Sequence, residues 1–219
     1  PLADGGDSTI EVVNYYLNGD TIEVEVNNPV FNKVKANYLY AQASKTAFIE
    51  MAEASGLKLL KSHEQNCRHT STFGTGQLIL DAINKGAKHI ILGIGGSATN
   101  DCGIGMATAL GYRFLDETNT EVKPIGNELI KIKTIDDSNV DPRLKSVAIQ
   151  IACDVTNPLY GLNGAAYVYA KQKGASNSDI EFLNQGLQSF SKILEDHFNV
   201  NIQEIAGAGA AGGMGAGCI

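Results

Sequence analysis

Proline is scarce in this sequence, and long apolar runs and basic clusters are missing. The 5 prolines are outnumbered by 24 glycines, a composition that indicates tight turns in a folded domain rather than a linker. The longest apolar runs, such as residues 90–92, are far shorter than the ~20 residues of a membrane span. Acidic residues outnumber basic ones by 24 to 17, and no Lys/Arg cluster is present to neutralise phosphates. These absences argue against a membrane partner and against a nucleic-acid partner.

The cysteines and histidines form no convincing disulfide or metal pattern. The four cysteines are widely spaced and contain no CxxC pair, which favours free thiols in a reducing compartment and hence a cytoplasmic protein. His63, Cys67 and His69 cluster, but no second pair of ligands lies at a suitable spacing, so a polar loop is favoured over a zinc site. The chain has no repeat or linker, so we expect one domain. Because it begins with Pro1 and ends in a glycine-rich run, we also expect it to belong to a longer protein.

Hydrophobic periodicity predicts strands and helices that alternate along the chain. Strands are expected at residues 21–26, 34–40, 46–51, 89–94, 112–115 and 147–153. Helices are expected at 10–17, 78–86, 106–110 and from 178 onward, the first and last opened by capping boxes at Ser8/Glu11 and Ser178/Glu181. The runs at 89–94 and 147–153 are continuously apolar, as in strands buried on both faces. This order predicts an α/β fold, a mixed β-sheet flanked by helices.

A glycine-rich loop at residues 93–101 directly follows the apolar strand at 89–94. Ligands of α/β sheets bind beyond the carboxyl ends of strands, where loop amides face an anion. Asp101 adds a carboxylate suited to Mg²⁺ or to a substrate hydroxyl. The alternative is a strand-to-helix turn that Asp101 caps. The candidate phosphate-binding residues of this loop are Gly95, Gly96, Ser97, Thr99 and Asn100.

Two further stretches offer polar groups or close backbone approach. Asp154 ends the strand at 147–153, and Asn157 follows it, although an Asx turn before proline would leave the same pattern. Lys173 lies nearby and could neutralise a phosphate or a carboxylate, unless it is simply solvated. Residues 207–217 lack bulky side chains, so we expect a ligand or interface role rather than a core role. The candidate ligand-binding glycines there are Gly207, Gly209 and Gly212.

A dinucleotide-binding oxidoreductase is an alternative. Residues 93–98 match the pattern G-x-G-x-x-A after a strand, with Asp116 placed as a ribose-binding acid, and residues 207–212 match a similar pattern. Against this alternative, residues 100–103 interrupt the helix that should begin at once. No GxxxxGK[ST] motif is present, which excludes an ordinary P-loop kinase for this segment. A non-catalytic ligand-binding or regulatory lobe is a second alternative.

The motifs, taken in order along the chain, resemble those of the bacterial type I glycerate kinase family. Residues 1–6 (PLADGG), 49–57 (IEMAEASGL), 73–77 (FGTGQ) and 93–101 (GIGGSATND) correspond to successive family motifs. Residues 154–159 (DVTNPL), 172–175 (QKGA) and 207–213 (GAGAAGG) continue the match. Cys102 stands where the family has glycine, and Gln77 where it has glutamate. The family's opening strand and closing segment have no counterpart here.

The resemblance implies that residues 1–219 are the inserted lobe of a two-lobed α/β kinase, whose missing N- and C-terminal lobe is its partner. It implies ATP-dependent phosphorylation of D-glycerate to phosphoglycerate, with 2-phosphoglycerate favoured, and ATP and Mg²⁺ as cofactors. The lobe alone is expected to be inactive, and a homodimer is compatible with the pattern. The implied catalytic residues are Asp101, Asp154 and Lys173. One of the two aspartates would bind Mg²⁺ or take the hydroxyl proton, and Lys173 would counter negative charge.

Overall fold

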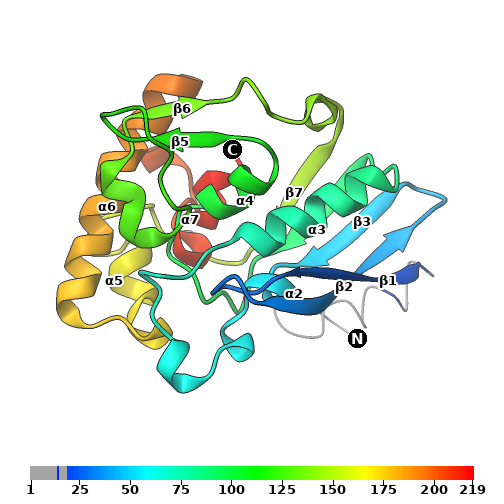
Figure 1. Ribbon diagram of the computed structural model, residues 1–219, viewed down its shortest axis with the longest axis horizontal. Helices are drawn as coiled ribbons and strands as arrows, with labels where there is room; N and C mark the ends of the chain where they lie inside the picture. Colours follow the sequence, from blue (N-terminus) through cyan, green and yellow to red (C-terminus); the bar gives the residue numbers. More distant parts are fainter. Residues whose placement is uncertain (1–13, 15–18) are drawn as a thin grey trace.

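The computed structural model describes Asn14 and residues 19–219. Its centre is a five-stranded sheet in the order β1-β2-β3-β4-β7, which Figure 1 shows with helices packed beside it. The strands are β1 (Asp20–Asn27), β2 (Lys33–Ala41), β3 (Thr46–Glu50), β4 (His89–Gly93) and β7 (Ala148–Ala152). The sheet is mixed, because β1, β2 and β3 pair antiparallel whereas β3, β4 and β7 pair parallel. The predicted α/β class is therefore confirmed. The helix expected at 10–17, with its capping box at Ser8 and Glu11, lies outside the described residues apart from Asn14.

The strand at 147–153 exists, but the expectation that both of its faces are buried is wrong. In the described part of the chain β7 pairs only with β4 and forms one edge of the sheet. None of its five residues is fully buried, and Ala148 and Gln150 are exposed. An apolar composition indicates that a strand tends to be buried, but it does not indicate whether the strand lies at the centre or at the edge of the sheet.

Helix α3 (Phe73–Asn84) packs as the sequence predicts. Its apolar stripe, Leu78, Ile79, Ala82 and Ile83, is buried. The helix ends just before Gly86, whose φ of +94° a residue with a Cβ would rarely adopt. The buried side chains of β3 and β4 join this stripe in one apolar core, together with Met214 from helix α7 (Ala210–Gly217).

Helix α6 (Asn177–Phe198) begins earlier than the sequence pattern suggests. Its N-cap is Ser176, whose hydroxyl accepts from the amide of Asp179, and the Asp179 carboxylate accepts from the Ser176 amide. The predicted pair Ser178 and Glu181 lies inside the helix. The same four-residue spacing occurs twice in this stretch, and the pair nearer the preceding loop forms the cap.

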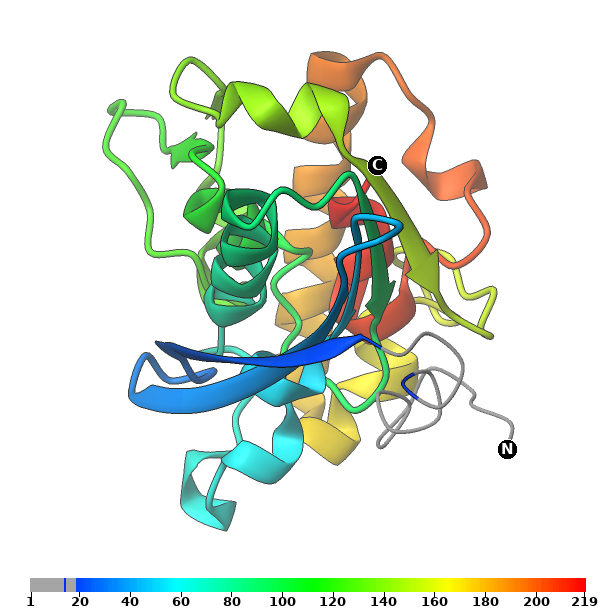
Figure 2. The same cartoon turned by 90° about the vertical axis from the view of Figure 1, so that its right-hand side faces the viewer.

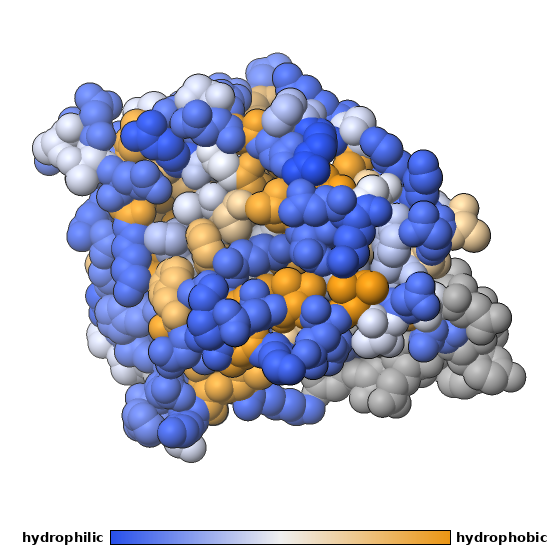
Figure 3. Space-filling model, turned by 45° about the vertical axis from the view of Figure 1, so that its right-hand side comes forward, coloured by the Kyte–Doolittle hydropathy of each residue, from blue (hydrophilic) through white to orange (hydrophobic). Residues whose placement is uncertain are grey.

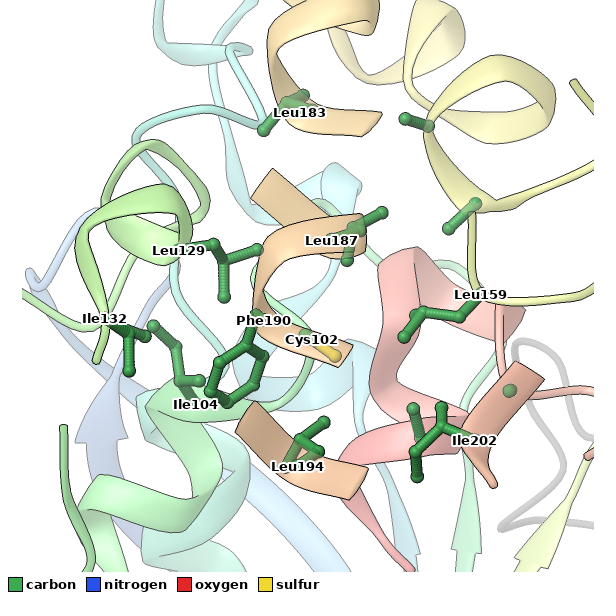
Figure 4. Packing of buried hydrophobic residues seen from close by; sticks show 14 of the residues in the cluster. Cys102, Ile104, Leu129, Ile132, Leu159, Leu183, Leu187, Phe190, Leu194 and Ile202 are labelled. Atoms are coloured by element: carbon green, nitrogen blue, oxygen red, sulfur yellow. The ribbon is translucent and has the colours of Figure 1, made fainter. Parts of the chain in front are cut away.

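A second core surrounds α6. Leu187, Phe190 and Leu194 of α6 face Leu129 and Ile104, as Figure 4 shows. This core also receives helix α5 (Ala165–Tyr169) and the short helix α4 (Ile104–Ala109). Helix α2 (Ala52–Ser55) and the 3₁₀ segments complete the described helices: Leu57–Leu59, Ser62–Glu64, Gly126–Lys131, Pro142–Ser146, Lys171–Lys173 and Ile202–Glu204. The strand expected at 112–115 forms as β5 (Arg113–Leu115), but it pairs with β6 (Thr134–Asp136) in a separate two-stranded sheet.

Residues 207–217 contribute to the core, contrary to the expectation from their small side chains. Ala208, Ala210, Met214 and Ala216 are buried, and α7 lies in the middle of the molecule in Figures 1 and 2. Glycine is required where the backbone passes close to other loops. A Cβ on Gly212 would lie 2.1 Å from the carbonyl oxygen of Thr99, and one on Gly209 would lie 2.1 Å from that of Pro158. The glycines thus bring three loops together by backbone contact.

Hydrophilic residues cover much of the face shown in Figure 3, with apolar side chains between them. None of the helices in the described residues is long and apolar enough to cross a membrane.

Candidate active site

A pocket of about 830 Å³ lies at the carboxyl ends of the parallel strands β3, β4 and β7. The register places Glu50, Gly93 and Ala152 in one row across these strands. The chain that leaves β4 therefore brings Gly95, Gly96 and Ser97 beside Asp154, which leaves β7, and all of them line the pocket. The parallel pairing of these strands thus brings the loops together at the carboxyl end of the sheet, where α/β proteins commonly bind ligands. A second cavity of about 210 Å³, against α4 and α6, has mainly apolar walls and is a weaker candidate.

Lys173 is the buried cation of this pocket. Its side chain is only 3% exposed, and its ammonium group donates to the Ser97 hydroxyl at 2.6 Å and to the Thr99 carbonyl at 2.8 Å. Burial lowers the pKa of Lys173 to about 8, and the nearby negative charge of Asp101 acts in the opposite direction. Burial also raises the pKa of the Cys67 thiol to about 11, so this neighbour is neutral at pH 7. Lys173 thus places a buried positive charge against the glycine-rich loop.

Asp101 does not line the pocket. It is fully buried, and its carboxylate accepts hydrogen bonds from the amide and hydroxyl of Thr72, both at 2.8 Å, and from the amides of Gly103 and Gly105. Burial raises the pKa of Asp101, whereas these four donors favour its charged form. The carboxylate therefore joins the start of α3 to the start of α4. This geometry matches the capping alternative rather than a metal-binding or catalytic position.

Thr99 and Asn100 lie behind the pocket wall. Both are completely buried, and the Thr99 carbonyl rather than its hydroxyl contacts Lys173. Within Asn14 and residues 19–219, the Thr99 hydroxyl and both amide atoms of Asn100 have no hydrogen-bond partner. Neither residue lines the pocket.

Asn157 and the C-terminal glycines do not line the pocket themselves, but they contact or neighbour residues that do. Asn157 accepts a hydrogen bond from the hydroxyl of Tyr169 at 2.6 Å, and Tyr169 lines the pocket. Neither Gly207, Gly209 nor Gly212 lines it, but Ala210 and Ala211 between them do. Ala211 has a left-handed φ of +53°, a conformation that costs energy for alanine and is often found beside functional sites.

Sequence reasoning missed Glu50 as a site residue. Glu50 ends β3, lines the pocket and is only 6% exposed. The signal was present in the sequence, because an acid at the end of a predicted strand is the pattern that singled out Asp154. Lys35, Lys58 and Glu53 complete the charged residues of the wall, and these were missed as well.

The dinucleotide-binding arrangement does not form. The helix that should follow Ala98 at once begins only at Ile104 and has six residues. Asp116 lies after β5, outside the main sheet, and its carboxylate accepts from Thr118 and Thr120 within its own turn. The second glycine match, at 207–212, follows a 3₁₀ segment instead of a strand. The pattern was met twice by chance in a glycine-rich chain.

Comparison with known proteins identifies the family of the chain. A family model described as the glycerate kinase family matches residues 1–219. The chain belongs to the glycerate kinase family. It is 48% identical over 219 residues to a glycerate kinase of Halalkalibacterium halodurans, covering 100% of this chain and 58% of that protein. It is 45% identical over 216 residues to a glycerate 2-kinase of Escherichia coli K12, covering 99% of this chain and 57% of that protein.

The fold comparison gives the same result. The crystal structure of a Salmonella typhimurium LT2 protein assigned as glycerate kinase 2 superposes with a TM-score of 0.95 at 44% identity. The match covers 99% of this chain and 58% of that one. The chain thus spans 56–58% of the length of most of the curated glycerate kinases that it matches.

Proposed function

We propose that this chain is the inserted lobe of an ATP-dependent kinase that phosphorylates D-glycerate to 2-phosphoglycerate. Membership of the glycerate kinase family supports the reaction, and the similarity to a glycerate 2-kinase supports the position of the phosphate. The observation that carries the proposal is the buried Lys173 held on the glycine-rich loop at the carboxyl end of β4. Phosphoryl transfer depends on positioning and charge neutralisation more than on covalent chemistry, and this wall offers both.

The glycine-rich loop and Lys173 would bind an anion, either a phosphate group of ATP or the glycerate carboxylate. Gly95 and Gly96 expose backbone without side chains, and Gly96 adopts a left-handed φ of +70°. Lys173 supplies a full charge in a place where water screens it little. Asp101, Thr99 and Asn100 do not line the pocket, and Asp101 would act indirectly through its hydrogen bonds to Thr72, Gly103 and Gly105.

Asp154 is the exposed carboxylate of the pocket and would bind Mg²⁺ or accept the proton of the attacking hydroxyl. Among the described residues no group of three His, Cys, Asp or Glu side chains could hold a metal. That suits Mg²⁺, which keeps several waters and usually binds one or two carboxylates together with substrate phosphates. Mg²⁺ bound there would neutralise charge on the transferred group.

Two further features belong to this proposal. The longer relatives suggest that a second lobe supplies the remaining nucleotide-binding groups, so the 219-residue chain alone would bind weakly and give no turnover. The four cysteines are free thiols, which supports a reducing cytoplasmic setting.

Glycerate-dependent release of ADP by the full-length protein tests the proposal. Asp154→Asn should lower kcat at least 100-fold, in the range of a lost general base or metal ligand. Extra Mg²⁺ should restore part of the activity if Asp154 binds the metal and none if it takes the proton. Asp101→Asn is the matched comparison. Its activity should fall only in proportion to the decrease in the amount of folded protein. Wild-type rates in the Asp154 variant, or tight binding of NAD, would contradict the proposal, and phosphorus NMR identifies the product.

A further inference from the structure

Residues 65–68 form a loop that packs against the backbone carrying Lys173. The amide of Cys67 donates to the Lys173 carbonyl at 3.2 Å, and the Cys67 side chain is completely buried. The Cys67 thiol lies close enough to the ammonium group to influence its charge. The two segments are so close together that a Cβ on Gly174 would be 1.9 Å from the carbonyl oxygen of Gln65. This loop therefore contributes to the burial of Lys173.

Arg68 ends this loop and connects it to helix α6. Its guanidinium group donates to the Asp179 carboxylate at 2.8 Å and to the side-chain oxygen of Asn127 at 3.0 Å. It also lies 4.2 Å from the centre of the Phe182 ring. We call these four residues the Arg68 clamp. Because the planar guanidinium binds three partners at once, the clamp has a more fixed geometry than a simple ion pair at the surface.

The chain segment that follows Lys173 is bound to the same aspartate. The Asp179 carboxylate accepts hydrogen bonds from the amide and the hydroxyl of Ser176, three residues after Lys173. Hydrogen bonds from Arg68 and Ser176 lower the pKa of Asp179 to about 2, so the ion pair is charged at neutral pH. One carboxylate therefore holds both sides together, the loop through Arg68 and the segment of Lys173 through Ser176.

Arg68 does not line the pocket, yet its contacts fix the loop that packs against Lys173. We infer that Arg68 is a positioning residue, which holds loop 65–68 closed and so keeps the ammonium group of Lys173 buried against Ser97. Its effect on activity rests on the proposed function, in which Lys173 binds an anion. A charge that water screens little attracts an anion more strongly than a solvated one. Loss of the clamp admits water to Lys173 and weakens that attraction.

The other charged groups around Lys173 stay in place when the clamp is altered. Burial lowers the pKa of Lys173, and the Cys67 thiol and the Asp101 carboxylate act in the opposite direction. The remaining charged side chains on its own segment and around the pocket are Lys171, Lys35, Glu50, Glu53, Lys58 and Asp154. Substitutions at Arg68 and Asp179 leave all of these groups in the chain. A changed pKa of Lys173 therefore reports either on its burial or on the charge that the substitution removes.

Two variants distinguish a change in burial from a change in charge. Arg68→Met removes a positive charge, which by itself would raise the pKa of Lys173. Asp179→Asn removes a negative charge, which by itself would lower that pKa, and it keeps an oxygen for the Ser176 amide. Opening of the loop raises the pKa of Lys173 in both variants, because burial is the main cause of its low value. The sign of the change in Asp179→Asn is therefore decisive.

The experiment uses the full-length protein with a carbon-13 label at Cε of lysine. NMR titration gives the pKa of Lys173, whose signal is assigned by its loss in Lys173→Met, and kcat/KM for glycerate is measured over the same pH range. We expect the pKa to rise by about one unit or more in Arg68→Met and Asp179→Asn, with the alkaline limb of kcat/KM moving equally. Arg68→Lys keeps the charge without the planar fork and should give a smaller rise. Arg113→Met, which removes an ion pair of the separate two-stranded sheet, is the matched control and should change neither quantity.

The outcomes separate this inference from the proposed function. Circular dichroism establishes that each variant is folded, and if Arg68→Met does not fold, Asp179→Asn decides. An unchanged or lowered pKa of Lys173 in folded Asp179→Asn overturns the positioning role of Arg68. A raised pKa with an unmoved alkaline limb supports that role and contradicts the part of Lys173 in the reaction. A wild type without glycerate-dependent release of ADP overturns the proposed function, and the NMR titration still decides whether Arg68 keeps Lys173 buried.

Discussion

Lys173 should link the stability of the chain to pH in a direction opposite to that of most lysines. Its pKa falls from 10.5 to about 8 because burial disfavours the charged form. The unfolded chain then binds this proton more tightly, so between about pH 8 and 10.5 the unfolded state carries more protons. The free energy of unfolding should therefore rise with pH across that window. This lowering of the pKa corresponds to about 3 kcal/mol in the free energy of unfolding. Solvent screens the charge little, because the group is buried.

Urea unfolding of wild type and Lys173→Met, followed by circular dichroism from pH 7 to 10.5, measures this effect. Subtracting the two curves removes the contribution of every other titrating group. We expect the wild type to gain about 3 kcal/mol relative to the variant by the end of the range. Lys171→Met, which removes an exposed lysine two residues earlier, is the control and should run parallel to wild type. A difference for Lys173→Met that stays within about 1 kcal/mol at every pH would refute the reasoning.

The activity of the full-length protein should change in the opposite direction. As pH rises through about 8, Lys173 loses the charge that the proposal assigns to anion binding, so kcat/KM should fall while the fold becomes more stable. A merely structural lysine would not produce this pair of opposed trends.

Two substitutions behind the pocket wall test the loop contacts. Asp101→Ala leaves the amides of Thr72, Gly103 and Gly105 without their acceptor in the interior. The free energy of unfolding, measured by urea denaturation, should fall by about 3 kcal/mol or more. A loss below about 1 kcal/mol would contradict the role of Asp101 as an anchor. Gly212→Ala places a Cβ 2.1 Å from the Thr99 carbonyl at a φ of +76° and should cost about 2 kcal/mol or more, while Ala216→Gly in the same helix should cost about 1 kcal/mol.

The elements with strong periodicity could be predicted from the sequence, and those that depend on neighbours could not. The stripes of α3 and α6 and the alternation in β1 determine which face is buried, because a residue's place on a helix or strand follows from its number in the chain. The edge position of β7 depends on the order of strands in the sheet, which no local pattern encodes. The core role of residues 207–217 depends on partners far away in the sequence, at Thr99 and Pro158.

Asp101 and Asp154 show most clearly where local sequence stops being informative about function. Each follows an apolar strand, Asp154 directly and Asp101 after the glycine-rich loop, so the same argument marked both as candidate carboxylates for a ligand. The difference arises because α4 begins at Ile104, three residues after Asp101, and the start of α3 contacts Asp101 through Thr72. Four donors from two helix starts surround that carboxylate, whereas the chain after Asp154 continues as an irregular loop with the side chain exposed to the pocket. The amides at a nearby helix start thus engage the carboxylate of Asp101 within the fold, whereas the carboxylate of Asp154 is exposed to the pocket.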